Sequence, residues 1–550
     1  MTKGFGNGRI VAVLSLVGLL SAEAQAAQKK VIAGGWDFQC FTPQQMLEQA
    51  DQFESTGLDG VVFALKVFRC RDGVVRNFAW YATHEPHISK DEFAAYVPAY
   101  RELVKKPGFR ESLVATCWVP IGADRFAWTD DAAWARFAQN MAAFAWLAKE
   151  GGLRGMVADN EDYSKSYQYE LLAGDPPYEQ TAALARRRGR EIGQAIFTEY
   201  PDITLYFFWL LSMDRTLAAA PDPLHAAQAK GNLWVPFVNG ILDVMPPGAK
   251  LVDGDEHGYG YHTDRHDFDL AAARHAITEM SLVAPENRKK FRSQVSFASG
   301  QYLDGILEDA SKRTDGTTAL QILADRLRAA AAVSDEYLWL WGEKNRWIKW
   351  KNLKTPYPQM KIAEERWEDR YPGLGEALRE ITHPNQYLLR RLSKARTAQA
   401  ENLLAPALKR ANGSWQTKKL QQGKFEYLPD QGKDGSVLMR ATGVGLGCFE
   451  LSVRGVKAGD RIAVEAYGKG PRSVFGSLRW RKDGKWFESM AHDVAALTGP
   501  ADADGWRRIV AQGRAPEGAD GFALQLEVRL GPGETAEFDR AFGCRLDEIR

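Results

Sequence analysis

Between residue 31 and about residue 350, apolar runs alternate with amphipathic stretches. The runs are largely continuous rather than alternating, which is typical of strands buried on both faces. The stretches between them, such as 130–150 and 317–334, have the spacing of helices. Eight strands that alternate with helices predict a (β/α)8 barrel over residues 27–355. The eight runs are Val31–Phe38, Gly60–Val67, Leu113–Gly122, Gly155–Asp162, Ile203–Leu211, Lys250–Glu256, Gln294–Gly300 and Tyr337–Gly342.

The rival architecture is an open, doubly wound sheet. Such a sheet is expected to have a glycine-rich turn after its first strand, and the segment Ile32–Asp37 lacks the GxGxxG pattern. The barrel is therefore favoured.

The pattern changes after the barrel. Residues 356–411 predict a helical extension and linker, punctuated by prolines such as Pro372 and Pro384. From 412 to 550, short alternating runs separated by glycines predict an all-β sandwich of jelly-roll type.

The first 26 residues have the pattern of a secretory signal. Lys3 and Arg9 form a basic region, Ile10–Leu20 is apolar, and Ala24-Gln-Ala26 fits a small-x-small cleavage site. The pattern predicts export, to the periplasm or beyond, with cleavage near Ala26. No later run of about 18 apolar residues occurs, so no membrane span is predicted.

Charge and cysteine content change this picture little. The net charge of the 550 residues is +1, which favours neither nucleic acid nor an anionic membrane as a partner. An exported chain can form disulfides, and Cys40–Cys70 and Cys448–Cys544 are candidate pairs, with Cys117 left over. Unpaired buried thiols are the alternative.

Acidic residues mark the ends of the fourth and sixth strands, where a (β/α)8 barrel builds its site. Asp159 and Glu161 are two apart, so on a strand they face the same side, about 7 Å apart at the backbone. Two such acids push their pKa values apart, which supplies an acid and a nucleophile. Asp255 and Glu256 are adjacent, so only one of them easily faces the pocket; either is a candidate partner of Glu161.

Tryptophans follow four of the strands: Trp36, Trp118, Trp209 and Trp341. Their flat faces suit the C–H faces of sugar rings. A metal held by His257, Asp253 and Asp255 is less favoured than a hydrogen-bonding role for this histidine. No catalytic cofactor is expected. Further strand-end candidates for substrate binding are Asp37, Lys66, Tyr163, His257, Tyr259 and Glu343.

The segment Gly152–Tyr163 resembles the strand-four motif of (β/α)8 glycoside hydrolases, in which a carboxylate follows an apolar strand. The C-terminal region resembles carbohydrate-binding modules of the galactose-binding-like type. That resemblance implies a structural calcium and a binding face with exposed aromatics, for which Trp480, Trp486 and Trp506 are candidates. The segments that carry it are Val456–Ile462, Leu478–Gly484, Gly505-Trp506, Arg514–Ala519 and Glu537–Asp539.

The resemblance leaves the mechanism open. Acids on strands four and six, with none at Ala298–Gly300 on strand seven, are similar to retaining α-glycosidases. Asp159-x-Glu161 also fits the substrate-assisted chitinase-like pattern, whose fuller signature is missing. The resulting hypothesis is an exported glycoside hydrolase of a poly- or oligosaccharide. The alternatives are a non-catalytic glycan-binding barrel, a polysaccharide lyase and a metal-dependent hydrolase.

Overall fold

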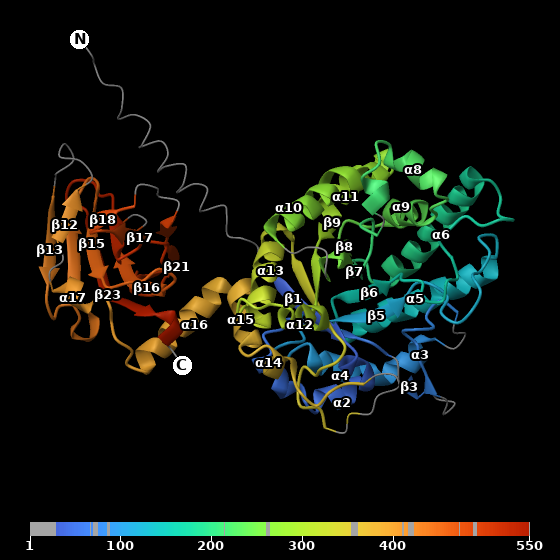
Figure 1. Cartoon of the computed structure of the whole chain (residues 1–550), viewed down its shortest axis with the longest axis horizontal. Helices are drawn as coiled ribbons and strands as arrows, with labels where there is room; N and C mark the ends of the chain where they lie inside the picture. Colours follow the sequence, from blue (N-terminus) through green and yellow to red (C-terminus); the bar gives the residue numbers. More distant parts are fainter. Residues whose placement is uncertain are drawn as a thin grey trace, which may run out of the picture. The chain divides into compact units, whose positions relative to one another are not determined.

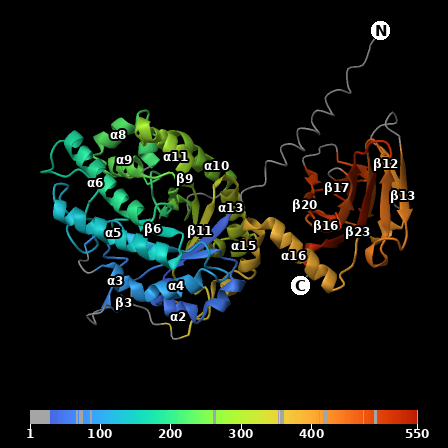
Figure 2. The same cartoon turned by 180° about the vertical axis from the view of Figure 1, so that it is seen from behind.

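The computed structural model divides into two compact units, residues 26–383 and a second unit that contains residues 384–550. Figures 1 and 2 show both from opposite sides. The secretory signal predicted over residues 1–26 lies outside the described residues and stays a prediction. The structure describes residues 29–65, 68–69, 75–84, 88–213, 215–259, 264–351, 353, 361–409, 412–415, 423–471, 474–487 and 492–548.

The first unit is a parallel barrel. Its nine-stranded sheet has the order β10-β11-β1-β2-β5-β6-β7-β8-β9. Only Ala298 separates β9 from β10, so these two are one interrupted strand that closes the sheet into eight. All eight predicted strands and the barrel are confirmed. The strands are β1 (Lys30–Gly35), β2 (Gly60–Phe63), β5 (Leu113–Cys117), β6 (Gly155–Asp159), β7 (Thr204–Phe207), β8 (Lys250–Asp253), β9 (Val295–Phe297), β10 (Ser299–Tyr302) and β11 (Tyr337–Gly342); a separate hairpin joins β3 (Phe68–Arg69) and β4 (Val75–Arg76).

Helices surround the sheet, and local sequence explains where they begin and end (Figure 1). Thr42 and Gln45 form a capping box with Pro43 at the first position of α2. Asp130 caps α5 through its side chain, and Gly152 ends it with a φ of 74°. The helices are α2 (Pro43–Leu47), α3 (Lys90–Phe93), α4 (Val97–Leu103), α5 (Asp131–Gly151), α6 (Tyr178–Glu199), α7 (Arg215–Ala218), α8 (Pro223–Ala229), α9 (Trp234–Val244), α10 (Arg265–Ala273), α11 (Arg288–Gln294), α12 (Leu303–Ser311), α13 (Ala319–Val333), α14 (Trp367–Arg370) and α15 (Leu374–Thr382).

Side chains along each barrel strand alternate between two apolar cores, as the pleat of a strand requires. On β6, for example, Val157 belongs to the core inside the barrel, whereas Met156 and Ala158 belong to the core between strands and helices. This alternation decides which strand-end residues reach the mouth. The inner core contains Ile32, Val62, Leu113, Val157, Tyr206, Phe208, Val252, Ala298, Tyr337 and Trp339.

The second unit is a sandwich of two antiparallel sheets, which confirms the predicted all-β domain. One sheet has the order β12-β15-β22-β17-β18, with β19 paired to β17, and the other has the order β13-β14-β23-β16-β21-β20. Apolar side chains from both sheets, including Phe449, Trp480 and Phe538, form a common core. The strands are β12 (Asn412–Trp415), β13 (Lys424–Leu428), β14 (Leu438–Thr442), β15 (Gly447–Arg454), β16 (Arg461–Lys469), β17 (Phe475–Lys482), β18 (Lys485–Trp486), β19 (Val494–Ala495), β20 (Leu497–Ala501), β21 (Arg507–Arg514), β22 (Gly521–Val528) and β23 (Thr535–Arg545).

The helices between 356 and 411 divide between the units: α14 and α15 belong to the barrel unit, whereas α16 (Pro384–Thr397) and α17 (Ala405–Leu408) belong to the sandwich unit. Leu388 and Leu392 of α16 pack in one buried cluster with Ala463 and Phe542. Helix α16 therefore covers the outer face of one sheet and forms part of the second unit.

The predicted disulfide between Cys448 and Cys544 is wrong. Both residues are buried free thiols, and burial raises the pKa of each thiol to about 12. Cys448 lies in β15 and Cys544 in β23, which belong to different sheets, so the sandwich core separates them. Cys70 lies outside the described residues, so its pairing with Cys40 stays a prediction.

Other expectations for the chain have mixed outcomes. Trp480 is 1% exposed and belongs to the sandwich core, so it is no surface aromatic. Trp486 lies against the guanidinium groups of Arg479 and Arg481, at 4.5 and 4.1 Å from its ring centroid. A structural calcium stays a prediction. Over the described segments, the structure has no helix whose length and apolar character would suffice to span a bilayer.

Candidate active site

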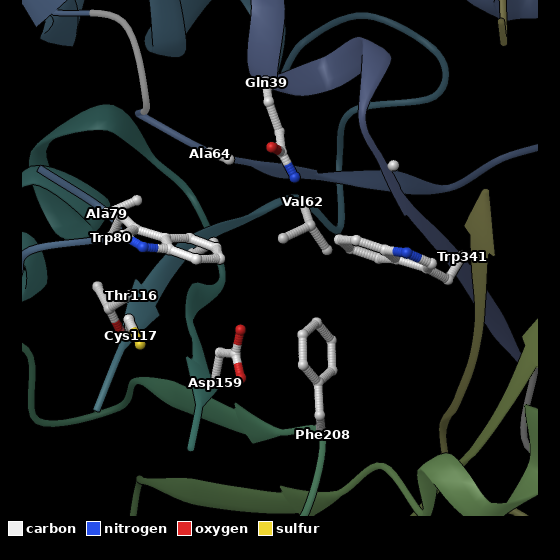
Figure 3. A pocket seen from close by; sticks show the side chains of 12 residues that line it. Gln39, Val62, Ala64, Ala79, Trp80, Thr116, Cys117, Asp159, Phe208 and Trp341 are labelled. Carbon is white, nitrogen blue, oxygen red and sulfur yellow. The ribbon is translucent and has the colours of Figure 1, made fainter. Parts of the chain in front are cut away.

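A partly open pocket with a cavity volume of about 40 Å³ lies at the carboxyl ends of the barrel strands. Asp159, at the end of β6, and Phe208, just after β7, lie on one side of it (Figure 3). The indoles of Trp80 and Trp341 extend into it from opposite sides, and the Gln39 amide faces it from the side away from Asp159. The lining thus combines flat aromatic surfaces with a few polar groups, as small-molecule sites do.

The alternation of β6 brings Asp159 toward the mouth, and Glu161 lies in the loop that follows this strand. Asp159 is in phase with Val157 of the inner core, and Glu161 follows two residues later. The backbone N–H of Glu161 donates to Oδ1 of Asp159 at 3.0 Å. The Tyr163 hydroxyl donates to the Glu161 carboxylate, and the Tyr163 ring stacks on Trp80 with centroids 6.0 Å apart.

The third acid is Glu256, the first residue of the short 3-10 turn η4 (Glu256–Tyr259) after β8. Burial, followed by the charges of Glu161 and Asp159, raises the pKa of Glu256 to about 9; hydrogen bonds from Tyr259 and Trp209 oppose this only in part. Burial and like charges both disfavour a second carboxylate. Glu256 therefore carries a proton at neutral pH and can donate it.

The structure separates Glu256 from its neighbour Asp255. Asp255 is 3% exposed and has a φ of 38°, and its backbone N–H donates to Oδ1 of Asp253 at 3.3 Å. β8 ends at Asp253, and the left-handed conformation of Asp255 departs further from strand geometry, so strand phase does not decide which of the two acids turns inward. The charges that raise the pKa of Glu256 come from Glu161 and Asp159, so Glu256 lies near both of these acids.

Asp253 has a structural role in the loop after β7. Its carboxylate accepts the backbone N–H groups of Leu211, at 2.8 Å, and of Ser212, at 3.0 Å. Among the described residues, the group whose ligand atoms are close enough for a metal is Asp253, His275 and Glu279, and it does not include His257. The Nε2 atom of His257 instead lies 3.1 Å from the carbonyl oxygen of Ser212.

Glu343 forms a further acidic position at the end of β11. Its carboxylate accepts the Tyr302 hydroxyl at 3.1 Å and the indole N–H of Trp341 at 3.3 Å. Its backbone N–H donates to Asp304 at 2.8 Å, which fixes the start of the loop. The rings of Tyr302 and Tyr259 stack with centroids 5.3 Å apart, so aromatic contacts join Glu343 to the turn of Glu256.

Two predicted substrate contacts are wrong. Trp118 is fully buried, and its ring packs against Phe137, Phe207 and Phe237, because residue 118 is out of phase with the inward residues of β5. Asp37 is also fully buried.

The Asp37 carboxylate is occupied within the fold. It accepts the backbone N–H of Trp347 and the indole N–H of Trp350, each at 2.9 Å. Burial raises the pKa of Asp37 to about 6 despite these hydrogen bonds. Asp37 therefore ties the loop after β11 to the end of β1.

The other candidates lie just after barrel strands or outside the described residues. Trp36 is half-buried after β1, and the Trp209 ring lies edge-on to His257 with centroids 4.4 Å apart. Lys66 lies outside the described residues.

Sequence reasoning missed Gln39 and Trp80. Gln39 lies in a helical turn after β1 and Trp80 in a turn after β4, so neither is at the last position of a strand, where candidates were sought. A signal for the orientation of Trp341 was present in the glycine at position 34: a Cβ there would lie 2.6 Å from the indole, so only glycine leaves room for this ring over β1.

No protein-family model matches the chain, and no curated protein sequence matches it. Among solved structures, it is similar to the exo-β-1,4-mannosidase Op5Man5 from Opitutaceae bacterium strain TAV5, with 15% identity and a TM-score of 0.38, over 66% of this chain and 62% of that one. It is similar to the 3-keto-D-glucoside 4-epimerase YcjR from E. coli, with 12% identity and a TM-score of 0.31, over 64% of this chain and 99% of that one.

A third likeness is to the N-terminal endo-1,4-β-D-xylanase 10B of Clostridium thermocellum, with 12% identity and a TM-score of 0.19, over 27% of each chain. The chain thus covers less than two thirds of the mannosidase and xylanase chains. At these identities and TM-scores the likenesses carry no argument about activity, and the two folds rest on their own strand pairing.

Proposed function

We propose that the protein is an exported glycoside hydrolase that cleaves a poly- or oligosaccharide at the mouth of the barrel. One observation carries the proposal: Glu256 is buried beside Glu161 and Asp159, and burial and their charges raise its pKa to about 9. Glycosidic cleavage needs one carboxylic acid and one carboxylate on either side of the scissile bond. Environments that push two such pKa values apart identify the acid and its partner.

In this proposal Glu256 protonates the glycosidic oxygen as its bond to the anomeric carbon breaks. Glu161 supplies the carboxylate, which accepts a hydrogen bond from the Tyr163 hydroxyl. The carboxylate either attacks the anomeric carbon or takes a proton from the attacking water; the first route retains and the second inverts the configuration of the product. Trp80 and Trp341 support the proposal because indole faces suit the C–H faces of sugars.

The test compares two leaving groups in a single variant, Glu256→Gln. A glycoside with a sugar or alkyl leaving group needs the proton, so kcat should fall about 100- to 10,000-fold. A 4-nitrophenyl glycoside of the same sugar leaves with little help, so its kcat should fall much less. Product stereochemistry, followed by NMR in the wild-type protein, reports the role of Glu161.

Each variant rate is read against the wild-type rate on the same substrate, so a folding defect would lower both substrates equally. An equal loss on the two leaving groups contradicts a role for Glu256 as the acid. Saturable binding of glycans by a wild-type protein that cleaves none of them would instead support the non-catalytic glycan-binding alternative.

A further inference from the structure

Gln39 is a shielded polar group of the pocket, and no described residue forms a hydrogen bond with its amide oxygen. The residue is 4% exposed and lies in the short helical turn η1 (Asp37–Cys40) after β1. Its Oε1 atom is buried and finds no hydrogen-bond partner among the described residues. A buried amide oxygen left in this state lowers the stability of the fold. Its retention is explained if a ligand supplies the missing donor.

The turn that carries Gln39 is firmly held. The carboxylate of Asp37 accepts N–H groups from Trp347 and Trp350, and the backbone N–H of Gln39 donates to the carbonyl oxygen of Trp36 at 3.1 Å. The amide therefore points into the pocket from a fixed backbone (Figure 3). A preorganised donor and acceptor loses little freedom when it binds.

The surroundings of the amide indicate what it meets. Trp80 and Trp341 extend from opposite sides of the pocket, with Asp159 across from the amide (Figure 3). A pyranose ring in this space would place its C–H groups against the indoles. Its edge away from Asp159 would then present hydroxyl groups to Gln39, and adjacent hydroxyls offer both a donor and an acceptor, as the amide does.

The charge of the mouth narrows the choice of sugar. Asp159 and Glu161 lie close enough to act on Glu256, so the site already holds mutually repelling acids. A uronic acid would add another carboxylate to this group and be repelled. A neutral sugar does not experience this repulsion.

We propose that Gln39 is the specificity-determining residue of the pocket. Its side-chain amide forms hydrogen bonds with the hydroxyl groups of a neutral pyranose unit held between Trp80 and Trp341. This inference rests on the proposed glycoside hydrolase function for its substrate class. It adds to that function a residue that binds the sugar, Gln39, and a preference for neutral sugars, neither of which follows from the paired acids.

The test uses Gln39→Met in the full-length protein, in a Glu256→Gln background that prevents turnover. Methyl glycosides of glucose, mannose, galactose and glucuronic acid are titrated while tryptophan fluorescence is followed. At least one neutral glycoside should bind, more tightly than the glucuronide, and Gln39→Met should weaken that binding about 10- to 100-fold. The same substitution at Gln44, which is exposed on α2, is the matched control and should change nothing.

Urea unfolding separates recognition from a structural role. Because Oε1 of Gln39 has no hydrogen-bond partner in the described part of the chain, Gln39→Met should unfold at the same or a higher urea concentration than its parent. Lower stability with unchanged affinity overturns the inference, as does stronger binding of the glucuronide or an absence of saturable binding by every neutral glycoside.

Activity tells the two proposals apart. In the protein with Glu256 intact, Gln39→Met should lower kcat/KM for a cleaved glycoside by the same factor. Hydrolysis that is unaffected by Gln39→Met removes the inference and keeps the function. Neutral-sugar binding that depends on Gln39, in a protein that cleaves nothing, keeps the inference and removes the function.

Discussion

Carboxylates at the two ends of the barrel have opposite electrostatic surroundings. At the amino ends of the strands, each of two acids meets cations: Glu111 pairs with Lys30 at 3.3 Å and with Arg154 at 3.0 Å, and Glu336 pairs with Lys30 at 3.3 Å and with Lys250. Burial opposes the ionised form of Glu336, but the hydrogen bonds and charges of Lys250 and Lys30 prevail and lower its pKa. These charges stabilise the fold.

At the carboxyl ends, the acids face one another instead. The charges of Glu161 and Asp159 add to burial and raise the pKa of Glu256. Holding these groups together costs stability, and clusters of this kind concentrate at functional sites. The direction of the carboxyl pKa shifts, rather than the number of acids, therefore distinguishes the mouth at the carboxyl ends of the strands from the amino ends.

The largest expected effect compares one acid from each end with the same substitution. Glu161→Gln should lower kcat about 100- to 10,000-fold, because it removes the carboxylate that completes the reaction. Glu336→Gln should leave kcat within about twofold, since Glu336 lies at the opposite end of the strands. Initial rates on a cleaved glycan measure both, and comparable losses in the two variants would break the distinction between the ends.

Stability should respond to pH with opposite signs at the two ends. The raised pKa of Glu256 means that the unfolded chain ionises first, so wild-type stability falls as pH rises from about 4 toward 9. Glu256→Gln should therefore be more stable than wild type at pH 8, by about 1–3 kcal/mol, with the gap closing below about pH 4.

Glu336→Gln should show the reverse. The lowered pKa of Glu336 contributes stability above the ordinary carboxyl range, and that contribution is lost as pH falls through the lowered value. This variant should be less stable than wild type at neutral pH, by about 1 kcal/mol, with the gap closing in acid. Urea unfolding across the pH range measures both variants, and shifts of the same sign would contradict the comparison.

A further pair of variants extends the comparison to the sandwich. Glu465 is 1% exposed, and its carboxylate accepts hydrogen bonds from Arg396 of α16 and, at 2.7 Å, from Arg508. Arg396→Met should destabilise the second unit by about 1–2 kcal/mol, because one of two cations is removed from a buried acid. Thermal unfolding followed by circular dichroism measures this.

The matched control is Lys424→Met, which removes an exposed pair with Glu426 and should cost less than about 0.5 kcal/mol. Catalytic rates should be unchanged in both variants. An equal shift in both would show that α16 gains nothing from the buried acid.

Much of the architecture was determined by the sequence. Eight apolar runs predicted the barrel, and the short alternating runs after residue 412 predicted the sandwich. The spacing of Asp159 and Glu161 predicted a common face on one strand, but β6 ends at Asp159. These features are local, and strand period, helix caps and turns are set by neighbouring residues.

Only the tertiary structure decided which residues face the pocket. Strands buried on both faces are apolar at every position, so their sequence does not reveal which side faces inward. Closure of the sheet set that phase, which turned Trp118 toward the helices, and the left-handed backbone at Asp255 turned Glu256 toward Glu161. Gln39 and Trp80 reach the pocket from turns that follow strands, and the course of such turns depends on what they pack against.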